Sequence, residues 1–119
     1  MPVEIKRGEI YWVDWNPARG SEQKGARPAL VIQNDIGNKF GSTTIVASCS
    51  TKIKESFPFV VHIKIQDSGL PEDCAIDLGQ IMTIAKSRLR NKCGQLNQTK
   101  MNEVATALKI SLAIEPANT

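Results

Sequence analysis

Runs of apolar residues separated by short polar segments dominate the first half of this 119-residue chain. Ile10–Trp15 combines β-branched and aromatic residues, and Asn16-Pro17 then prevents a strand from continuing. Ala29–Ile32 is continuously apolar, as in a strand buried on both faces, and this run stops at Asn34-Asp35. The pattern therefore predicts two strands joined by a loop of about a dozen residues, a length that is usually functional or disordered.

Three further strands are predicted in the middle of the chain. Thr43–Ala47 is β-branched and apolar, Pro58–Ile65 alternates between apolar and polar residues, and a fifth strand runs over Cys74–Ile81. Residues 36–42 are too few and too rich in glycine for more than about one helical turn. Residues 66–73 form a turn-rich connection.

The last part of the chain predicts helix. Thr83–Leu89 is expected to form a short helical turn, and a longer helix begins near Asn97 or Thr99, either of which could cap it. Its apolar stripe consists of Met101, Val104, Ala105, Leu108 and Leu112. The elements together predict a mainly β fold, a small barrel of five strands with a C-terminal helix, as a single domain over residues 1–119.

Composition and charge limit the possible functions without selecting one. A hydrophobic content of 41% and a charged content of 23% are ordinary for a soluble globular protein. A net charge of +3 permits nucleic-acid binding without requiring it. No apolar run approaches the roughly 20 residues that span a membrane, and the N-terminus lacks the order of a signal peptide. We therefore expect a cytoplasmic protein that does not bind membranes.

The cysteines and the histidine give little indication of a metal or cofactor. Cys49, Cys74 and Cys93 are odd in number, far apart in sequence and outside any CxxC motif, so reduced thiols are expected. His62 is the single histidine and falls on the polar face of its strand. We expect no metal site and no cofactor.

Two segments carry candidate chemistry for an anion. Pro28 fixes its own φ and biases Arg27 toward an extended backbone, which suits a cation held beside a phosphate. The small polar cluster at residues 48–51 precedes Lys52 and Lys54, and its hydroxyls could donate to phosphate oxygens. The same residues also suit a solvated strand end and an ordinary turn, so both interpretations stay open.

A series of motifs occurs in order along nearly the whole chain. These are Lys6–Asp14, Gly20-Ser21-Glu22, Arg27–Asp35, Gln80-Ile81 with Thr83-Ile84, and Lys86–Leu89. In this combination the chain resembles the MazF/PemK family of toxin endoribonucleases, the mRNA interferases. The resemblance implies an SH3-like small barrel of the MazF/CcdB type, a homodimer, and a MazE-like antitoxin with an acidic tail.

The resemblance also implies site residues. By its motifs, the resemblance implies that the catalytic residues are Arg27, Glu22 and Ser50. Many relatives have threonine where this chain has Ser50. Thr51 is the alternative source of the catalytic hydroxyl group. Serine keeps the donor and acceptor but loses the methyl group that restricts χ1. We expect RNA contacts from Arg19, Lys24, Gln33, Asn34, Thr51, Lys52, Lys54 and Gln80, although the lysines could equally serve only to solvate a surface.

The implied activity is sequence-specific, metal-independent cleavage of single-stranded RNA. The 2′-OH of RNA can attack the adjacent phosphate, which leaves a 2′,3′-cyclic phosphate and a 5′-OH end. Arg27 is expected first to stabilise charge in the transition state and only second to act as an acid, because arginine does not release a proton easily. Met82 and Ala85 stand where relatives commonly have Arg and Asp, which puts a role of this segment in RNA binding in doubt. Two alternatives are a CcdB-like gyrase poison and an SH3-like binding module.

Overall fold

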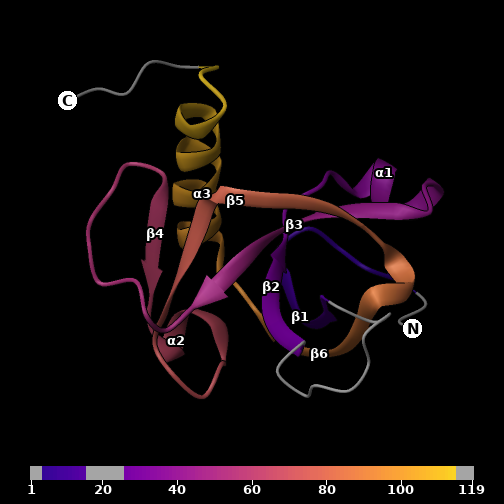
Figure 1. Cartoon of the computed structure of the whole chain (residues 1–119), viewed down its shortest axis with the longest axis horizontal. Helices are drawn as coiled ribbons and strands as arrows, with labels where there is room; N and C mark the ends of the chain where they lie inside the picture. Colours follow the sequence, from indigo (N-terminus) through magenta and orange to yellow (C-terminus); the bar gives the residue numbers. More distant parts are fainter. Residues whose placement is uncertain (1–3, 16–25, 115–119) are drawn as a thin grey trace.

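One curved antiparallel sheet organises the molecule. The computed structural model describes residues 4–15 and 26–114, and the strands within them pair in the order β4-β5-β3-β2-β1-β6. The strands are β1 (Glu9–Asp14), β2 (Ala26–Val31), β3 (Thr43–Ser50), β4 (Val60–Ile63), β5 (Cys74–Ala85) and β6 (Leu89–Gln95). The sheet curls into a barrel-like shape without closing, so β4 and β6 are its edges (Figure 1).

Short helical elements connect the strands, and one longer helix follows them. They are α1 (Asp35–Phe40), α2 (Ile65–Ser68), the 3₁₀ turn η2 (Lys86–Arg88) and α3 (Gln98–Ser111). In the described part of the chain, no helix is long and apolar enough to cross a membrane.

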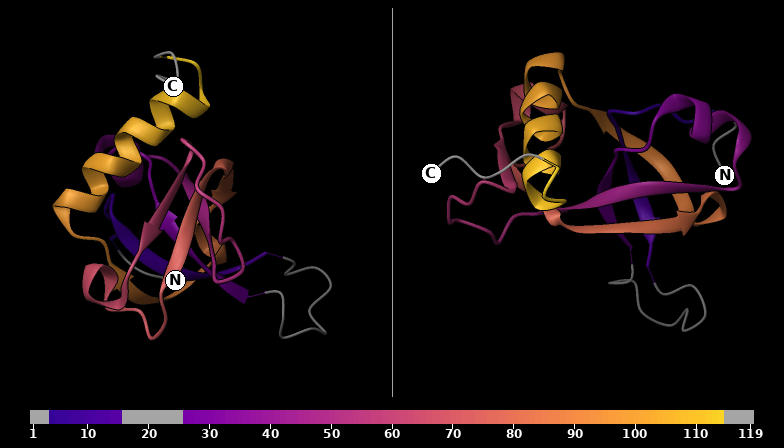
Figure 2. Two further views of the ribbon diagram at one scale, coloured as in Figure 1. Left: turned by 90° about the vertical axis from the view of Figure 1, so that its left-hand side faces the viewer. Right: turned by 90° about the horizontal axis from the view of Figure 1, so that it is seen from above.

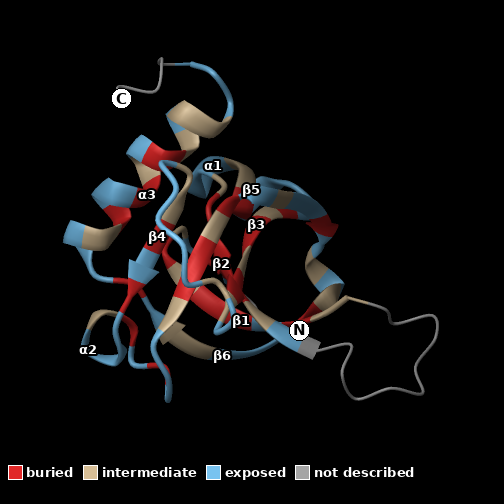
Figure 3. Ribbon diagram, turned by 60° about the vertical axis from the view of Figure 1, so that its left-hand side comes forward, coloured by how far each residue is buried: buried red, intermediate tan, exposed pale blue. Residues whose placement is uncertain are grey.

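The strand β2 is buried on both faces, as its continuous apolar run predicts. Leu30 belongs to the hydrophobic cluster that includes α3, which we call the outer core, whereas Ala29 and Val31 belong to a second cluster with Tyr11 and Val13. All three side chains are fully buried. Figure 3 shows the buried residues running along the central strands and the inner face of α3. The sheet therefore lies between two apolar cores, and the side chains of β2 are buried in both of them.

A bulge divides β5 into two halves that serve different cores. Ala47 of β3 lies opposite Ile81, but the next residue, Ser48, lies opposite Asp77. The three residues between these partners, 78–80, have no partner on β3, and a bulge of this kind bends a strand sharply. After the bulge the strand runs to Ala85, four residues beyond Ile81, where the sequence predicted its end.

The helix α3 covers the outer core beside β4 and β5 (Figure 2). Asn97 caps it by accepting a hydrogen bond from the Lys100 N–H at 2.8 Å, which decides between the two predicted caps. Met101 and Val104 are buried as predicted, together with Ala107. Leu112 was wrongly placed in the apolar stripe, because the helix ends at Ser111 and this side chain is 52% exposed.

Three further predictions of secondary structure were wrong. The sequence predicted five strands, but residues 89–95 form a sixth, and only residues 86–88 of the expected helical turn over 83–89 are helical. Polar residues dominate β6, which is an edge strand, so its pattern carries no apolar alternation. Ion pairs to β1 accompany the pairing, with Arg90 Nη2 2.5 Å from Asp14 Oδ2 and Lys92 Nζ 3.2 Å from Glu9 Oε2. The helix α2, which was not predicted, begins at Ile65, the last residue of the predicted fourth strand, and ends at Ser68 inside the connection 66–73.

Candidate active site

Residues of β1, β2 and β3 border a hollow of about 570 Å³. Four of the predicted site residues line this hollow: Arg27, Ser50, Thr51 and Lys52. Residues 70–72, from the connection after α2, lie along its other side. The structure therefore gathers the two segments in which the sequence predicted anion chemistry.

Arg27 lies at the start of β2, where it is exposed and paired with Val13 of β1. The register between β2 and β3 runs from Val31 opposite Val46 to Ala29 opposite Ser48. Continued by two residues, this register places Arg27 opposite Ser50. A guanidinium and a hydroxyl on adjacent strand ends are within reach of one phosphate group, because neighbouring strands lie about 5 Å apart.

A tight turn at the end of β3 orients the Ser50 hydroxyl. Its Oγ accepts a hydrogen bond from the Lys52 N–H at 3.0 Å, and Ser50 is half-buried. The hydroxyl hydrogen stays free to donate to a ligand. The Thr51 side chain is exposed, whereas the Ser50 hydroxyl is held in the turn. Ser50 is therefore the residue whose hydroxyl the turn positions.

Trp12 is a site residue that the sequence analysis missed. It lies on β1 directly opposite Pro28 of β2, lines the hollow, and is 41% exposed. Its neighbours in sequence, Tyr11 and Val13, are buried in the second hydrophobic cluster. The alternation of the strand could have indicated that Trp12 faces the other way. An exposed indole beside a cation offers a stacking surface for a base.

The three cysteines also meet in this hollow, although the sequence separates them widely. Cys49 of β3, Cys74 of β5 and Cys93 of β6 all line it as free thiols. Within residues 4–15 and 26–114, no group of three or more cysteine, histidine or acidic side chains is arranged to hold a metal ion. Sequence reasoning assigned these cysteines no site, because their convergence depends on the pairing of three distant strands.

Other predicted RNA-binding residues lie away from the hollow. Gln33 and Asn34 are six or seven residues along the chain from Arg27, a separation of about 20 Å in an extended strand. Asn34 caps α1 by accepting from the Gly37 N–H at 2.8 Å, and Gln33 Nε2 donates to the Thr43 carbonyl at 3.1 Å. Contacts with RNA stay a prediction for these two residues. Both side chains also have a structural role, in the hydrogen bonds just described.

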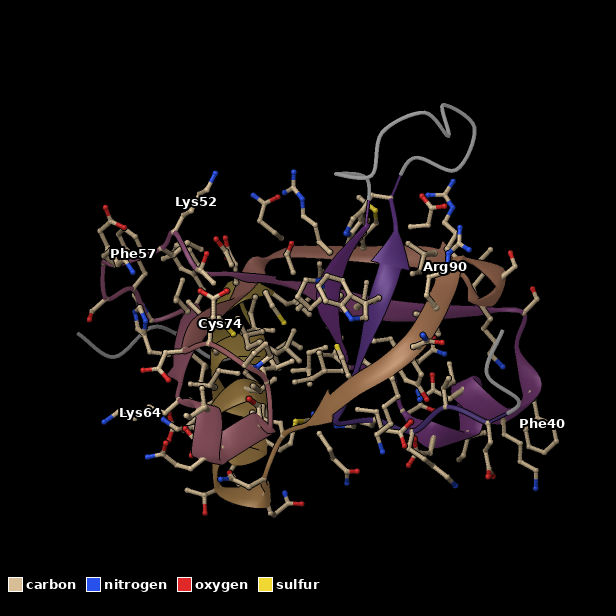
Figure 4. All side chains as sticks on the ribbon, turned by 90° about the horizontal axis from the view of Figure 1, so that it is seen from below. Phe40, Lys52, Phe57, Lys64, Cys74 and Arg90 are labelled. Atoms are coloured by element: carbon tan, nitrogen blue, oxygen red, sulfur yellow. The ribbon has the colours of Figure 1, made fainter. Side chains whose placement is uncertain are left out.

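Three lysines and a histidine border a second hollow of about 550 Å³, and Thr51 and Cys74 line both hollows. The basic residues are Lys54, Lys64, Lys100 and His62, and only Lys54 was predicted to contact RNA. Figure 4 shows Lys52, Cys74 and Lys64 at the end of the molecule opposite Phe40. Asp67 and Asp73 line the same hollow, so its charge is mixed.

The remaining predicted residues are on β5 or outside the described residues. Gln80 is exposed on the β5 bulge and does not line either hollow. Met82 and Ala85, the departures from the family pattern, are exposed in the second half of the strand. The positions of Arg19, Glu22 and Lys24 lie outside the described residues.

Comparison with known proteins defines the class. Residues 6–112 match the family model described as PemK-like, MazF-like toxin of type II toxin-antitoxin system. The chain therefore belongs to this family, and the resemblance found in the sequence is confirmed. Among curated proteins, Endoribonuclease EndoA of Bacillus subtilis (strain 168) is 48% identical over 111 residues, which cover 92% of this chain and 96% of that protein.

Solved structures confirm the barrel-like fold with its C-terminal helix. An endoribonuclease from Mycobacterial species, in complex with its cognate antitoxin, superposes with a TM-score of 0.79 at 23% identity, covering 95% of this chain and 99% of that chain. MazE-MazF from Deinococcus radiodurans gives a TM-score of 0.74 at 17% identity, covering 93% and 97%. At these identities the similarity establishes the fold.

Proposed function

We propose that this protein is a toxin endoribonuclease, formed by one domain over residues 1–119, that cleaves single-stranded RNA at a short recognition sequence. The observation that carries the proposal is the convergence of Arg27 and Ser50 at the rim of a hollow with an exposed tryptophan. The relative named an endoribonuclease, with 48% identity over 92% of this chain, supports the same activity.

The proposed chemistry uses the nucleophile that RNA itself supplies. The 2′-OH attacks the scissile phosphorus, the bond to the 5′-oxygen breaks, and the products are a 2′,3′-cyclic phosphate and a 5′-OH. Arg27 stabilises the negative charge that develops on the phosphate oxygens, and Ser50 donates a hydrogen bond to one of them. Because the attacking group belongs to the substrate, the reaction requires no metal-bound water.

The proposed mechanism also needs two proton transfers. The 2′-OH must lose a proton and the leaving oxygen must gain one. Glu22 is the carboxylate that the family motif offers as the base, and the Arg27 guanidinium can act only as a weak acid because arginine does not release its proton easily. Assigning Glu22 rests on the motif alone, and Glu22→Gln tests it through loss of cleavage with retained RNA binding.

Single-stranded RNA fits the site better than a duplex does. The Trp12 ring can stack on an unpaired base, whereas bases inside an A-form helix are closed to side chains. Lys52 in the first hollow and Lys54 in the second provide charge for the following phosphates.

The family implies partners for this chain. The Mycobacterial endoribonuclease and the Deinococcus radiodurans MazF are both found with antitoxins. We extend this to a MazE-like antitoxin with an acidic tail that occupies the basic surface of a cytoplasmic homodimer of this chain, which blocks RNA by occlusion.

The test is cleavage of a long single-stranded RNA in EDTA by the wild type and by Arg27→Ala. We expect cuts at one short motif with 2′,3′-cyclic ends, and a loss of about a hundred- to thousandfold in kcat for the variant. Arg90→Ala, which removes an arginine that does not line the hollow, is the matched control and keeps activity. Wild-type protein that cuts no RNA would favour a gyrase poison or a binding module.

A further inference from the structure

The hollow that holds Arg27 and Ser50 also contains a carboxylate. Among the described residues that line it, Glu72 is the one acidic side chain, and Arg27 and Lys52 are the cations. Glu72 is exposed, and its carboxylate forms no ion pair or hydrogen bond with another described residue. Both carboxylate oxygens are therefore available to a ligand in this hollow.

The segment that carries Glu72 is anchored on both sides. Leu70 is 7% exposed and packs in the outer core. Asp73 Oδ1 accepts a hydrogen bond from the Ile65 N–H at 2.9 Å, and Pro71 restricts the backbone between these two anchors. A side chain on a fixed segment loses less conformational freedom when it binds, so Glu72 is suited to a specific contact.

A carboxylate in this hollow cannot serve the RNA phosphates. In the proposed function Arg27 and Ser50 bind the scissile phosphate, and an ionised carboxylate repels that group. The carboxylate of Glu72 accepts hydrogen bonds but donates none, so its partner must be a part of the nucleotide that donates. Two parts of an RNA nucleotide do so, the 2′-OH and the N–H groups at the edge of a base.

Trp12 favours the base as this partner. Its indole lines the same hollow and is 41% exposed, which suits stacking on an unpaired base. An unpaired base presents its Watson–Crick edge to the protein. Guanine carries two adjacent donors there, N1–H and N2–H, which match the two oxygens of a carboxylate. The other three bases place an acceptor beside their donor on this edge, and that acceptor would face a carboxylate oxygen.

We propose that Glu72 is a specificity-determining residue, which accepts hydrogen bonds from the Watson–Crick edge of a guanine stacked on Trp12. The indole selects an unpaired base, the carboxylate selects guanine, and Arg27 with Ser50 holds the phosphate. Base reading by Glu72 rests on the proposed function, because it names one base of the RNA that the site would cleave.

The test is the cleavage of a pool of RNAs with randomised sequence, with the cut sites mapped by sequencing. We expect guanine at one position of the motif cut by the wild type. Glu72→Gln replaces one acceptor by a donor, so guanine should lose about five- to 150-fold relative to adenine at that position, while the other positions stay unchanged. A wild-type motif without guanine, or the same motif in Glu72→Gln, would overturn the proposal.

Inosine probes the same contact from the side of the RNA. It lacks the N2 amino group of guanine and keeps N1–H. Inosine at the selected position should slow cleavage by the wild type about tenfold, whereas Glu72→Ala should cleave both RNAs at similar rates. An equal loss in the two proteins would assign the amino group to a residue other than Glu72.

Contact with the 2′-OH is the rival role for Glu72, and it gives a different result. Glu72→Gln would then lower kcat by the same factor for every RNA sequence and leave the motif unchanged, which contradicts base reading. Glu103→Gln is the matched control, because Glu103 is an exposed carboxylate that lines neither hollow. This control should keep both the rate and the motif, and thermal unfolding establishes that each variant is folded.

Binding separates failure of base reading from failure of the proposed function. If the wild type cleaves no RNA, the proposed function fails, and fluorescence anisotropy with short uridine RNAs that carry one guanine or one adenine still tests Glu72. The guanine RNA should bind the wild type more tightly, and Glu72→Gln should reduce or reverse the difference. Glu72→Ala should bind plain oligouridine more tightly than the wild type does, because a charge that repels phosphate is removed. Equal binding of the guanine and adenine RNAs by the wild type would refute the role of Glu72.

Discussion

Trp12 lies directly opposite Pro28 across the pair formed by β1 and β2, and both side chains line the hollow that holds Arg27 and Ser50. The indole is 41% exposed even though the strand residues on either side of it are buried. Pro28 restricts the backbone beside Arg27, so the aromatic surface and the cation are positioned by the same strand pair. This arrangement combines a platform for a base with a charge for its phosphate.

The first prediction concerns this platform. Trp12→Ala should weaken binding of a short RNA that carries a 2′-deoxy group at the cleavage site by about 1–3 kcal/mol, roughly five- to 150-fold in Kd. The midpoint of thermal unfolding should change little, because the side chain is outside both cores. Fluorescence anisotropy measures the binding, and Trp12→Phe should retain most of the affinity. Unchanged affinity for Trp12→Ala would show that no base stacks there.

The second prediction decides which hydroxyl serves the reaction. Ser50→Ala should lower kcat by about a hundred- to thousandfold, as for other donors to a developing oxyanion, whereas Thr51→Ala should change it only severalfold. Ser50→Thr keeps both the acceptor for the Lys52 N–H and the donor, so it separates the hydroxyl from the turn. Single-turnover cleavage measures these rates. A greater loss for Thr51→Ala would transfer the role to Thr51.

Sequence patterns predicted the parts of the fold where burial dictates residue type. β2 and β3 are apolar because they lie between or beside cores, and the apolar stripe of α3 begins correctly with Met101 and Val104. β6 was missed since an edge strand rich in polar residues has no such requirement. Its pairing with β1 joins residues about 80 positions apart, which no local pattern encodes.

The same distinction holds for the candidate site. Arg27, Ser50 and Lys52 were identified from local motifs, and the structure places them together. Trp12 and Cys74 enter the hollow through the register of strands that are distant in sequence, so their grouping requires the fold. The role of Asn34 as the N-cap of α1 was also hidden, because an N-cap and a ligand contact use the same residue types.

The third prediction is a pH dependence of stability at Asp35. The Arg7 backbone N–H donates to Asp35 Oδ1 at 2.7 Å, and this bond, opposed by partial burial, lowers the pKa of the carboxyl group below its ordinary 3.8. A carboxyl group whose pKa is lower in the folded state stabilises the protein above its unfolded pKa, and this stabilisation is lost as pH falls through the folded pKa.

Asp35→Asn tests this dependence, because the amide keeps an acceptor but cannot ionise. Since Asp35 is exposed, we expect the variant to lose less than about 1 kcal/mol of unfolding free energy near neutral pH. The difference from wild type should shrink as the pH falls below the ordinary pKa of the carboxyl group. Urea unfolding at several pH values measures it, and a difference that is constant with pH would contradict a contribution from the charge.

The last prediction concerns the contact that joins α2 to β6 at Gly94. A Cβ atom at this position would lie 2.7 Å from the Ser68 carbonyl oxygen and 3.3 Å from Leu70 Cδ2, closer than normal contact allows. The oxygen belongs to the backbone, so the clash can be relieved only by moving α2 away from the strand. Gly94→Ala should therefore cost about 1–3 kcal/mol, the usual cost of overpacking, and lower the unfolding midpoint by several degrees. Calorimetry measures the change, and Gln95→Ala, at the exposed neighbouring position, should stay within about 0.5 kcal/mol of wild type. Equal stability of the two variants would mean that α2 shifts freely, and the connection after α2 would then not be a fixed wall of the hollow.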